Sequence, residues 1–167
     1  YIQAHSSEEE AFRAFVRNFP NTTLLVDTYD TIGGVKKITR LVKDLDPEFR
    51  IKAIRIDSGN IIESATEARN ILNKAGLSDV KIIASGGLDE WSISEIVKSG
   101  APVDSFGVGT RMVVSEDSPG TEIVYKLTSF AGVGRTKRSI GKEILPGEKQ
   151  VWRNLEEKKG GDLIGTI

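Results

Sequence analysis

The sequence has no cysteine, one histidine and one methionine among its 167 residues. The lack of cysteine excludes disulfide bonds, thiolate catalysis and thiolate-bound metals, and a single histidine argues against a zinc site. A charge excess of one sign is also missing, because 23 Lys and Arg residues are balanced by 24 Asp and Glu residues for a net charge of −1. A chain without a basic excess has no general attraction for nucleic acid, so we expect no nucleic-acid partner.

Long hydrophobic runs are missing as well. No apolar stretch approaches the roughly 18 residues that a membrane-spanning helix needs, and the N-terminal residues show no signal-peptide pattern. We therefore expect a cytoplasmic protein without a membrane partner. The length is sufficient for a sizeable hydrophobic core. The chain starts at Tyr1 without an initiator methionine, and we expect it to be part of a longer polypeptide.

Residues 1–115 show four short apolar runs that alternate with helical patterns. Strands are predicted near residues 24, 51, 80 and 103, and a Ser7–Glu10 capping box precedes the first helix, which ends at Pro20. The spacing of about 23–29 residues is typical of consecutive right-handed βαβ units. Because the strands are almost continuously apolar, we expect a parallel sheet in an α/β fold, as half of a TIM-like β/α barrel.

The character of the sequence changes in residues 116–167. Residues 123–128 alternate like a strand, residues 135–142 form a basic hairpin-like stretch, and residues 150–153 read as another short strand. We therefore expect an antiparallel β appendage that belongs to a second small domain.

Residues that carry chemistry follow the ends of all four predicted strands. They are Asp27 and Asp30; Arg55, Asp57 and Ser58; Ser85-Gly86-Gly87; and Gly107-Val108-Gly109-Thr110. In parallel βα folds the ligand lies beyond the carboxyl ends of the strands, so we expect these residues on one rim. Glycine turns hold phosphate through backbone N–H groups. Asp57 can accept hydrogen bonds from ribose hydroxyls or hold hydrated Mg²⁺, and Arg55 can pair with phosphate or carboxylate.

Each of these residues also has a structural interpretation, which the sequence leaves open. Asp27 and Asp30 can cap a turn and a helix. Arg55 and Asp57 lie two apart on one strand face and can form a structural ion pair. The glycines of residues 107–109 can serve close packing alone. Together, the four strand ends favour a phosphosugar-binding site.

Five segments resemble one family in the order in which they occur. These are residues 25–31 (LVDTYDT), 54–59 (IRIDSG), 83–91 (IASGGLDEW), 106–110 (FGVGT) and 147–153 (GEKQVWR). The sequence is similar to nicotinate phosphoribosyltransferase over essentially its whole length, and VDTYDT and SGGLDEW are specific to that family. The resemblance implies an incomplete α/β barrel joined to a smaller α+β domain built from both ends of the chain.

The resemblance also implies a reaction of NAD salvage. Nicotinate would attack the anomeric carbon of phosphoribosyl pyrophosphate to give nicotinate mononucleotide and pyrophosphate, with ATP hydrolysis driving the reaction and Mg²⁺ as cofactor. The transition state would be oxocarbenium-like, so positioning and charge stabilisation would carry most of the catalysis. The family also implies a homodimer or larger assembly.

Roles for individual residues follow from the resemblance. The two glycine turns, at residues 85–87 and 107–110, would bind the 5′-phosphate. Asp57 would contact the ribose or its metal, and Arg55 would lie near the base and the pyrophosphate. Asp27 or Asp30 would orient a histidine that is phosphorylated by ATP. Lys137 and Ser139 match a basic segment that would reach a phosphate in the partner subunit.

One family feature is not found in the sequence. The phosphorylated histidine belongs to a Gly-Thr-x-x-His motif, which we expect immediately upstream of Tyr1, and His5 lies past that position. The N-terminal domain of the family is missing too, so we expect the chain alone to be inactive and to need this N-terminal portion as a partner. The alternatives are a related nicotinamide or quinolinate phosphoribosyltransferase and a non-catalytic phosphosugar-binding module.

Overall fold

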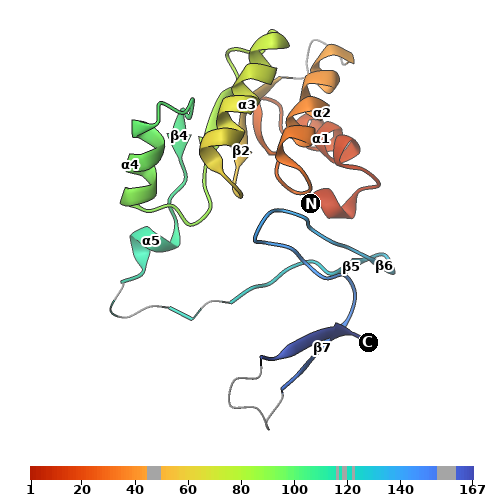
Figure 1. Cartoon of the computed structure of the whole chain (residues 1–167). Coiled ribbons are helices and arrows are strands. Elements are labelled where there is room, and N and C mark those ends of the chain that lie inside the picture. The colour runs from red at the N-terminus through yellow and green to blue at the C-terminus, as the bar shows by residue number, and fades with distance from the viewer. Residues whose placement is uncertain (45–49, 116, 118–119, 122, 154–160) are drawn as a thin grey trace.

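Four parallel strands form the main sheet of the structure, a computed structural model that describes residues 1–44, 50–115, 117, 120–121, 123–153 and 161–167 (Figure 1). The strands are β1 (Thr22–Leu25), β2 (Ile51–Ile56), β3 (Lys81–Ala84) and β4 (Ser105–Phe106). They lie side by side in the order β1-β2-β3-β4. Spatial order that follows chain order is the arrangement of successive strands in a β/α barrel, so the expected α/β fold is confirmed.

Four main helices connect or precede these strands. They are α1 (Glu8–Asn18), α2 (Thr31–Asp44), α3 (Ile61–Lys74) and α4 (Glu90–Lys98), and a short 3₁₀ turn, η1 (Ile2–Ala4), lies before them. The Ser7 side chain accepts a hydrogen bond from the backbone N–H of Glu10, as its capping box predicted, and the Asp89 side chain accepts one from the N–H of Ser92. Such caps satisfy N–H groups that have no partner inside the helix.

The hydrophobic core lies between the sheet and helices α1 to α3. Strand side chains such as Leu24, Ile54 and Ile82 are nearly or fully buried there. Opposite them lie the apolar faces of α2 (Val35, Ile38, Leu41) and α3 (Ala65, Ala68, Leu72). Their helical and alternating spacings place one face of each element on the core. No helix in the described ranges is long and apolar enough to span a bilayer.

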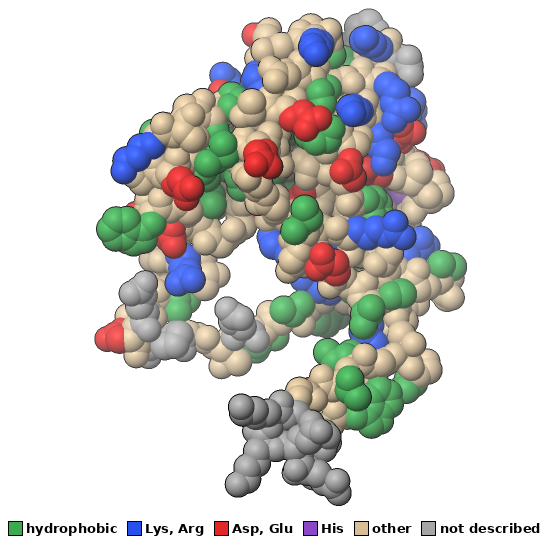
Figure 2. Space-filling view, in the orientation of Figure 1, with side chains coloured by type: hydrophobic (Ala, Val, Ile, Leu, Met, Phe, Trp, Pro, Cys, Tyr) green, Lys and Arg blue, Asp and Glu red, His purple; other side chains and the backbone are tan. Residues whose placement is uncertain are grey.

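The rest of the chain forms two small antiparallel hairpins. A short helix, α5 (Thr110–Val113), leads into the tail, defined here as residues 116–167. The first hairpin pairs β5 (Ser129–Phe130) with β6 (Val133–Gly134), and the second pairs β7 (Lys149–Trp152) with β8 (Leu163–Thr166). The antiparallel appendage and the strand near residue 150 are therefore confirmed. Figure 2 shows hydrophobic side chains gathered on the surface of the tail.

One expectation for the tail was wrong. Residues 123–128 form no strand, because no neighbouring segment in the described part of the chain pairs with their backbone and an isolated strand is not stable. The basic stretch of residues 135–142 does reverse direction as expected, in a turn that a hydrogen bond from the Lys142 N–H to the Ser139 carbonyl closes, but it contains no strand. The strand β8, whose partner β7 lies on the other side of residues 154–160, was not predicted.

Candidate functional site

Asp27 joins the loops that follow β1 and β2. Its side chain is 1% exposed, and its Oδ2 atom accepts hydrogen bonds from the backbone N–H of Asp57, at 3.2 Å, and from the Ser58 hydroxyl. The Oδ1 atom is buried and has no hydrogen-bond partner among the described residues. A buried carboxylate oxygen without a donor is costly, so this position requires an explanation beyond packing.

Asp57 joins the loop after β2 to the loop after β3 and to the tail. Its Oδ1 accepts from the Ser85 hydroxyl at 2.6 Å, and its Oδ2 accepts from Lys142 Nζ at 2.5 Å. Burial raises the pKa of Asp57, but hydrogen bonds from Lys142 and Ser85, with the charges of Lys142 and Arg55, outweigh it and hold this pKa below its ordinary value. Asp57 is therefore an ionised carboxylate at neutral pH.

The glycine turn after β3 brings backbone N–H groups close to Asp57. Gly86 and Gly87 have φ angles of 99° and 72°, in the region that only glycine adopts readily. A Cβ atom at Gly86 would collide with the Asp57 carbonyl oxygen and lie 3.2 Å from Lys142 Nζ. Within the described part of the chain, the N–H groups of Gly86 and Gly87 have no hydrogen-bond acceptor. They are free to bind an anion.

The second glycine turn, after β4, is used differently. The Gly107 N–H donates to the Ala84 carbonyl at 2.8 Å, and a Cβ at Gly107 would lie 3.2 Å from the Ser85 Cβ. Gly107 therefore serves close packing against the first turn, which is the structural interpretation left open above. Val108, Gly109 and Thr110 follow at the start of α5, on the same rim.

Asp30 occupies a capping position. Its Oδ1 accepts a hydrogen bond from the Gly33 N–H in the first turn of α2, and its side chain is exposed. Of the two acidic residues predicted after β1, Asp30 thus caps a helix, whereas Asp27 lies buried between two loops.

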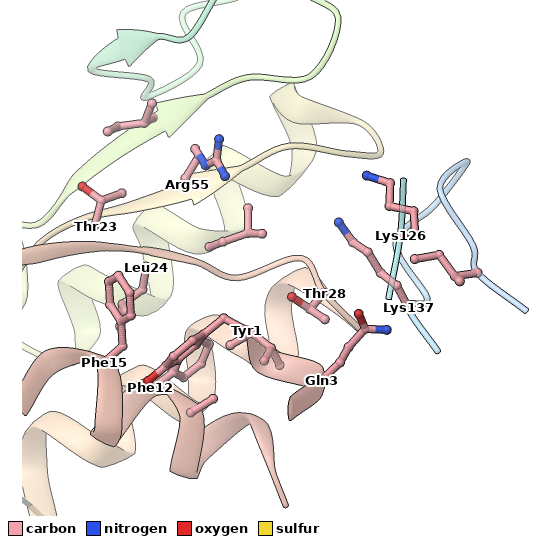
Figure 3. A pocket seen from close by; sticks show the side chains of 15 residues that line it. Tyr1, Gln3, Phe12, Phe15, Thr23, Leu24, Thr28, Arg55, Lys126 and Lys137 are labelled. Atoms are coloured by element: carbon pink, nitrogen blue, oxygen red, sulfur yellow. The ribbon is translucent and has the colours of Figure 1, made fainter. Parts of the chain in front are cut away.

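The face of the sheet opposite α2 and α3 borders a cavity of about 580 Å³. Leu25, Arg55 and Ile83 lie side by side on three neighbouring strands and line it. Figure 3 shows Arg55 from the sheet and Lys126 and Lys137 from the tail extending toward this space, with Tyr1 and the aromatic rings of α1 at its other side. The cavity thus combines apolar and aromatic walls with three cationic side chains, a combination suited to an aromatic anion.

The charges around the cavity are unequally compensated. Arg55 does not pair with Asp57, whose partner is Lys142, and it forms no salt bridge with any residue that the structure describes. Burial lowers the pKa of Lys137, the carboxylates of Asp27 and Asp57 raise it, and the charges of Lys142 and Lys126 lower it further. Arg55, Lys126 and Lys137 line the cavity, and no Asp or Glu of the described residues lines it, so its mouth is electropositive.

A loop of the tail lies against the rim. This docking loop, residues 137–144, is closed by a hydrogen bond from the Ile144 N–H to the Lys137 carbonyl at 3.1 Å. The Arg138 N–H donates to the Thr28 carbonyl at 3.0 Å, and the buried Ser139 hydroxyl donates to the Asp27 carbonyl. Ser139 thus bonds within its own chain, while Lys137 lines the cavity. Their contact with a partner subunit stays a prediction.

Neither Lys142 nor the hydrogen bond from the Ser58 hydroxyl to Asp27 was predicted from the sequence. Lys142 lies in a recognisable basic stretch, but its ion pair with Asp57 spans 85 positions of the sequence. Only the tertiary path of the tail brings these two residues together. His5 lies elsewhere, with Nδ1 3.0 Å from the Tyr1 carbonyl oxygen.

Both carboxylate oxygens of Asp57 accept hydrogen bonds, one from a hydroxyl and one from an ammonium group. In the described ranges no three His, Asp or Glu side chains are grouped so that they could hold a metal ion. Contact of Asp57 with a hydrated magnesium ion stays a prediction.

The fold and the rim define an α/β protein of the β/α-barrel class, with its candidate site at the carboxyl ends of the strands. No family model matches the chain. It is 49% identical over 166 residues to nicotinate phosphoribosyltransferase pncB2 of Mycobacterium tuberculosis, covering 99% of this chain and 36% of that protein. It is 34% identical over 173 residues to nicotinate phosphoribosyltransferase of Bacillus subtilis, covering 98% of this chain and 35% of that protein.

Solved structures agree on the fold. Nicotinate phosphoribosyltransferase from Vibrio cholerae superimposes with a TM-score of 0.66 at 19% identity, over 83% of this chain and 36% of that one. Nicotinate-nucleotide pyrophosphorylase from Pyrococcus furiosus gives a TM-score of 0.52 at 27% identity, over 96% and 39%. The resemblance to nicotinate phosphoribosyltransferase is thus confirmed, and the chain spans about a third of the length of the curated relatives it matches.

Proposed function

We propose that the polypeptide carrying this chain is a nicotinate phosphoribosyltransferase of NAD salvage, and that this chain supplies its phosphoribosyl-binding rim. The pyridine nitrogen of nicotinate attacks C1 of phosphoribosyl pyrophosphate. The bond from C1 to the pyrophosphate oxygen breaks, and pyrophosphate leaves with the electron pair. The observation that carries the proposal is the ionised Asp57 beside the glycine turn with free N–H groups.

The geometry supports a division of roles. The N–H groups of Gly86 and Gly87 bind the 5′-phosphate, with Thr110 on the neighbouring turn. Asp57 accepts hydrogen bonds from the ribose hydroxyls. Arg55 extends into the electropositive cavity, where an aromatic carboxylate meets both a cation and apolar walls. Holding the two reactants at these places lowers the barrier mainly through orientation and charge stabilisation.

ATP belongs to the proposal as a co-substrate that phosphorylates a histidine outside this chain. Of the two candidates that would orient the histidine, Asp27 is supported over Asp30. Asp27 has a buried oxygen without a donor in the described part of the chain, whereas Asp30 caps α2.

The assembly and location are also proposals. Large hydrophobic side chains are exposed along the tail, among them Tyr125 and Trp152 at 98% and 48%. Exposed apolar patches of this kind mark protein interfaces. We infer that they are covered in a homodimer or by the rest of the polypeptide, in the cytoplasm. Light scattering of the full-length gene product measures whether it is a homodimer.

The test is product formation by the full-length gene product. We expect nicotinate mononucleotide from nicotinate and phosphoribosyl pyrophosphate, at a higher rate with ATP than without it. Asp57→Ala should lower kcat/KM for phosphoribosyl pyrophosphate by at least about 100-fold, because it removes a carboxylate that holds the ribose. Transfer to nicotinamide in place of nicotinate contradicts the proposal, and so does sugar-phosphate binding without any transfer.

A second candidate is transfer to a pyridine dicarboxylate such as quinolinate. It is favoured by one observation, the three cationic side chains Arg55, Lys126 and Lys137 around the cavity. ATP separates the two candidates, because quinolinate transfer would proceed equally well without it.

A further inference from the structure

Lys142 lies at the centre of the rim. Its Nζ atom donates to the Asp57 carbonyl oxygen and to Asp57 Oδ2, each at 2.5 Å. The same nitrogen would lie 3.2 Å from a Cβ atom at Gly86, so it faces the turn whose N–H groups are free. The Lys142 and Asp57 side chains are 37% and 24% exposed, and both can be reached from solvent.

The position of Lys142 is fixed by its loop. Arg138 and Ser139 bond to the loop that follows β1, and the Lys142 N–H donates to the Ser139 carbonyl at 2.9 Å. The ammonium is therefore carried by a loop that is bonded to the segment after β1. A solvated surface lysine has no such anchoring.

Repulsion between two negative groups explains why a cation is needed beside Asp57. A phosphate dianion on the Gly86 and Gly87 N–H groups would lie next to the ionised carboxylate of Asp57, and like charges in contact repel each other strongly. An ammonium between them neutralises the carboxylate and attracts the phosphate. It has three N–H donors, of which Asp57 takes two. Asp27, Arg55 and Lys137 are the other charged groups nearby.

We propose that Lys142 is a phosphate ligand and positioning residue of this site: it neutralises Asp57 in the free protein and donates to the 5′-phosphate of a bound sugar phosphate. The inference rests on the proposed function of the rim. Lys142 allows the ribose-binding carboxylate of Asp57 and a phosphate on the neighbouring glycine turn to lie side by side. It acts from within the same chain.

Calorimetric titration of the full-length gene product with ribose 5-phosphate and with phosphoribosyl pyrophosphate tests this role. Lys142→Met should weaken binding of both ligands at least about tenfold, because a charge-assisted hydrogen bond is lost. Lys142→Arg should retain affinity within about threefold. Lys81→Met is the matched control, since it removes another Lys–Asp pair (to Asp104, 3.0 Å) at the opposite end of the sheet. It should leave both affinities unchanged.

A pH series separates phosphate binding from a structural role. The second ionisation of a phosphate monoester occurs near pH 6, so wild-type affinity for ribose 5-phosphate should rise between pH 5.5 and 7.5. In Lys142→Met this rise should be much smaller. A merely structural lysine would lower affinity equally at every pH, and that result overturns the inference. Unchanged or tighter binding by Lys142→Met also overturns it, because Lys142 would then only block Asp57.

The two proposals fail in different ways. If the wild-type protein transfers phosphoribosyl to nicotinate while Lys142→Met binds normally, the inference alone is wrong. If the wild-type protein binds ribose 5-phosphate through Lys142 but acts on another pyridine, the proposed function alone is wrong. If the wild-type protein binds neither ligand, both are wrong.

Discussion

The main sheet and the tail are held in place by different contacts. Every buried hydrophobic residue in the described part of the chain lies at or before Ile96, between the strands and their helices. In the described part of the tail the buried residue is Ser139, a polar one. The sheet is thus stabilised by a hydrophobic core, whereas the tail adds little buried apolar area of its own.

The tail is instead attached through the candidate site. Its docking loop bonds to Thr28, Asp27 and Asp57, all at the ends of β1 and β2. Two of these three partners are residues predicted from the sequence to act in binding or catalysis. The residues of the site therefore also hold two regions of the chain together, so substitutions there have structural as well as functional effects.

Loss of a buried side chain between the sheet and its helices should have the largest effect on stability. Ile54→Ala should lower the free energy of unfolding by about 2–5 kcal/mol, because Ile54 is fully buried between the sheet and its helices. Val151→Ala, in the half-exposed hairpin of the tail, should change it by no more than about 0.5 kcal/mol. Urea unfolding of the full-length gene product measures both. Equal losses would mean that the tail has a core of its own in the whole protein.

A second prediction concerns the turn where the two regions meet. Gly86→Ala should cost about 2–4 kcal/mol, because alanine disfavours its positive φ and the new Cβ would collide with the Asp57 carbonyl. Gly87→Ala is the matched control, with a similar φ but no atom within 4 Å of the new Cβ. It should cost about 1–2 kcal/mol. If both variants lose the same free energy, the close approach at Gly86 is not tight.

A third prediction breaks the attachment of the tail. Ser139→Ala removes a buried hydrogen bond to the Asp27 carbonyl, which contributes about 1 kcal/mol. Limited proteolysis should then cut the docking loop several-fold faster. The control is Thr39→Ala, whose hydroxyl bonds to the Lys36 carbonyl within α2. Unchanged cleavage of the docking loop in Ser139→Ala would show that other contacts hold it.

The smallest expected effects are the opposite pH dependences of Glu8, in α1, and Asp57, which bonds to the tail. Burial raises the pKa of Glu8 more than Lys37, at 2.8 Å, lowers it, and Asp30 and Asp27 raise it further. The folded protein therefore binds this proton more tightly than the unfolded chain. The stability that Glu8 contributes is complete below its ordinary pKa of 4.5 and is lost as the pH rises through its raised pKa.

Asp57 has the reverse sign. Because its pKa is lowered, its contribution is complete above 3.8 and is lost as the pH falls through the lowered value. The free energy of unfolding of Glu8→Gln should no longer fall as the pH rises above 4.5. The free energy of unfolding of Asp57→Asn should fall less steeply than that of the wild type as the pH drops below 3.8. A variant curve parallel to the wild-type curve in its own window contradicts the corresponding assignment.

Local patterns predicted the parts of the fold that local physics determines. The strands and helices of residues 1–115 follow from their apolar periodicity, and Ser7 and Asp89 cap helices because of their own hydrogen-bonding chemistry. The rim could be predicted because parallel strands end on one edge. The division at residue 115 stays a proposal.

The remaining features depend on contacts between distant segments. The hydrophobic alternation of residues 123–128 predicted a strand, but a strand also needs a neighbour, which the pattern does not supply. Asp27 and Asp30 look equivalent in the sequence, and only the packing of the β1 and β2 loops separates the buried residue from the capping one. Lys142 could not be placed at Asp57 for the same reason.

The docking loop has a consequence for how ligand and tail communicate. Since Lys142 is one of the contacts that hold the loop, a ligand that changes its bonds to Asp57 also changes the free energy of loop attachment. Thermodynamic linkage makes this relation reciprocal: whatever covers the tail and steadies the loop must alter the affinity of the rim by the same factor. Assembly of the protein and occupancy of its sugar-phosphate site would then form a single coupled equilibrium.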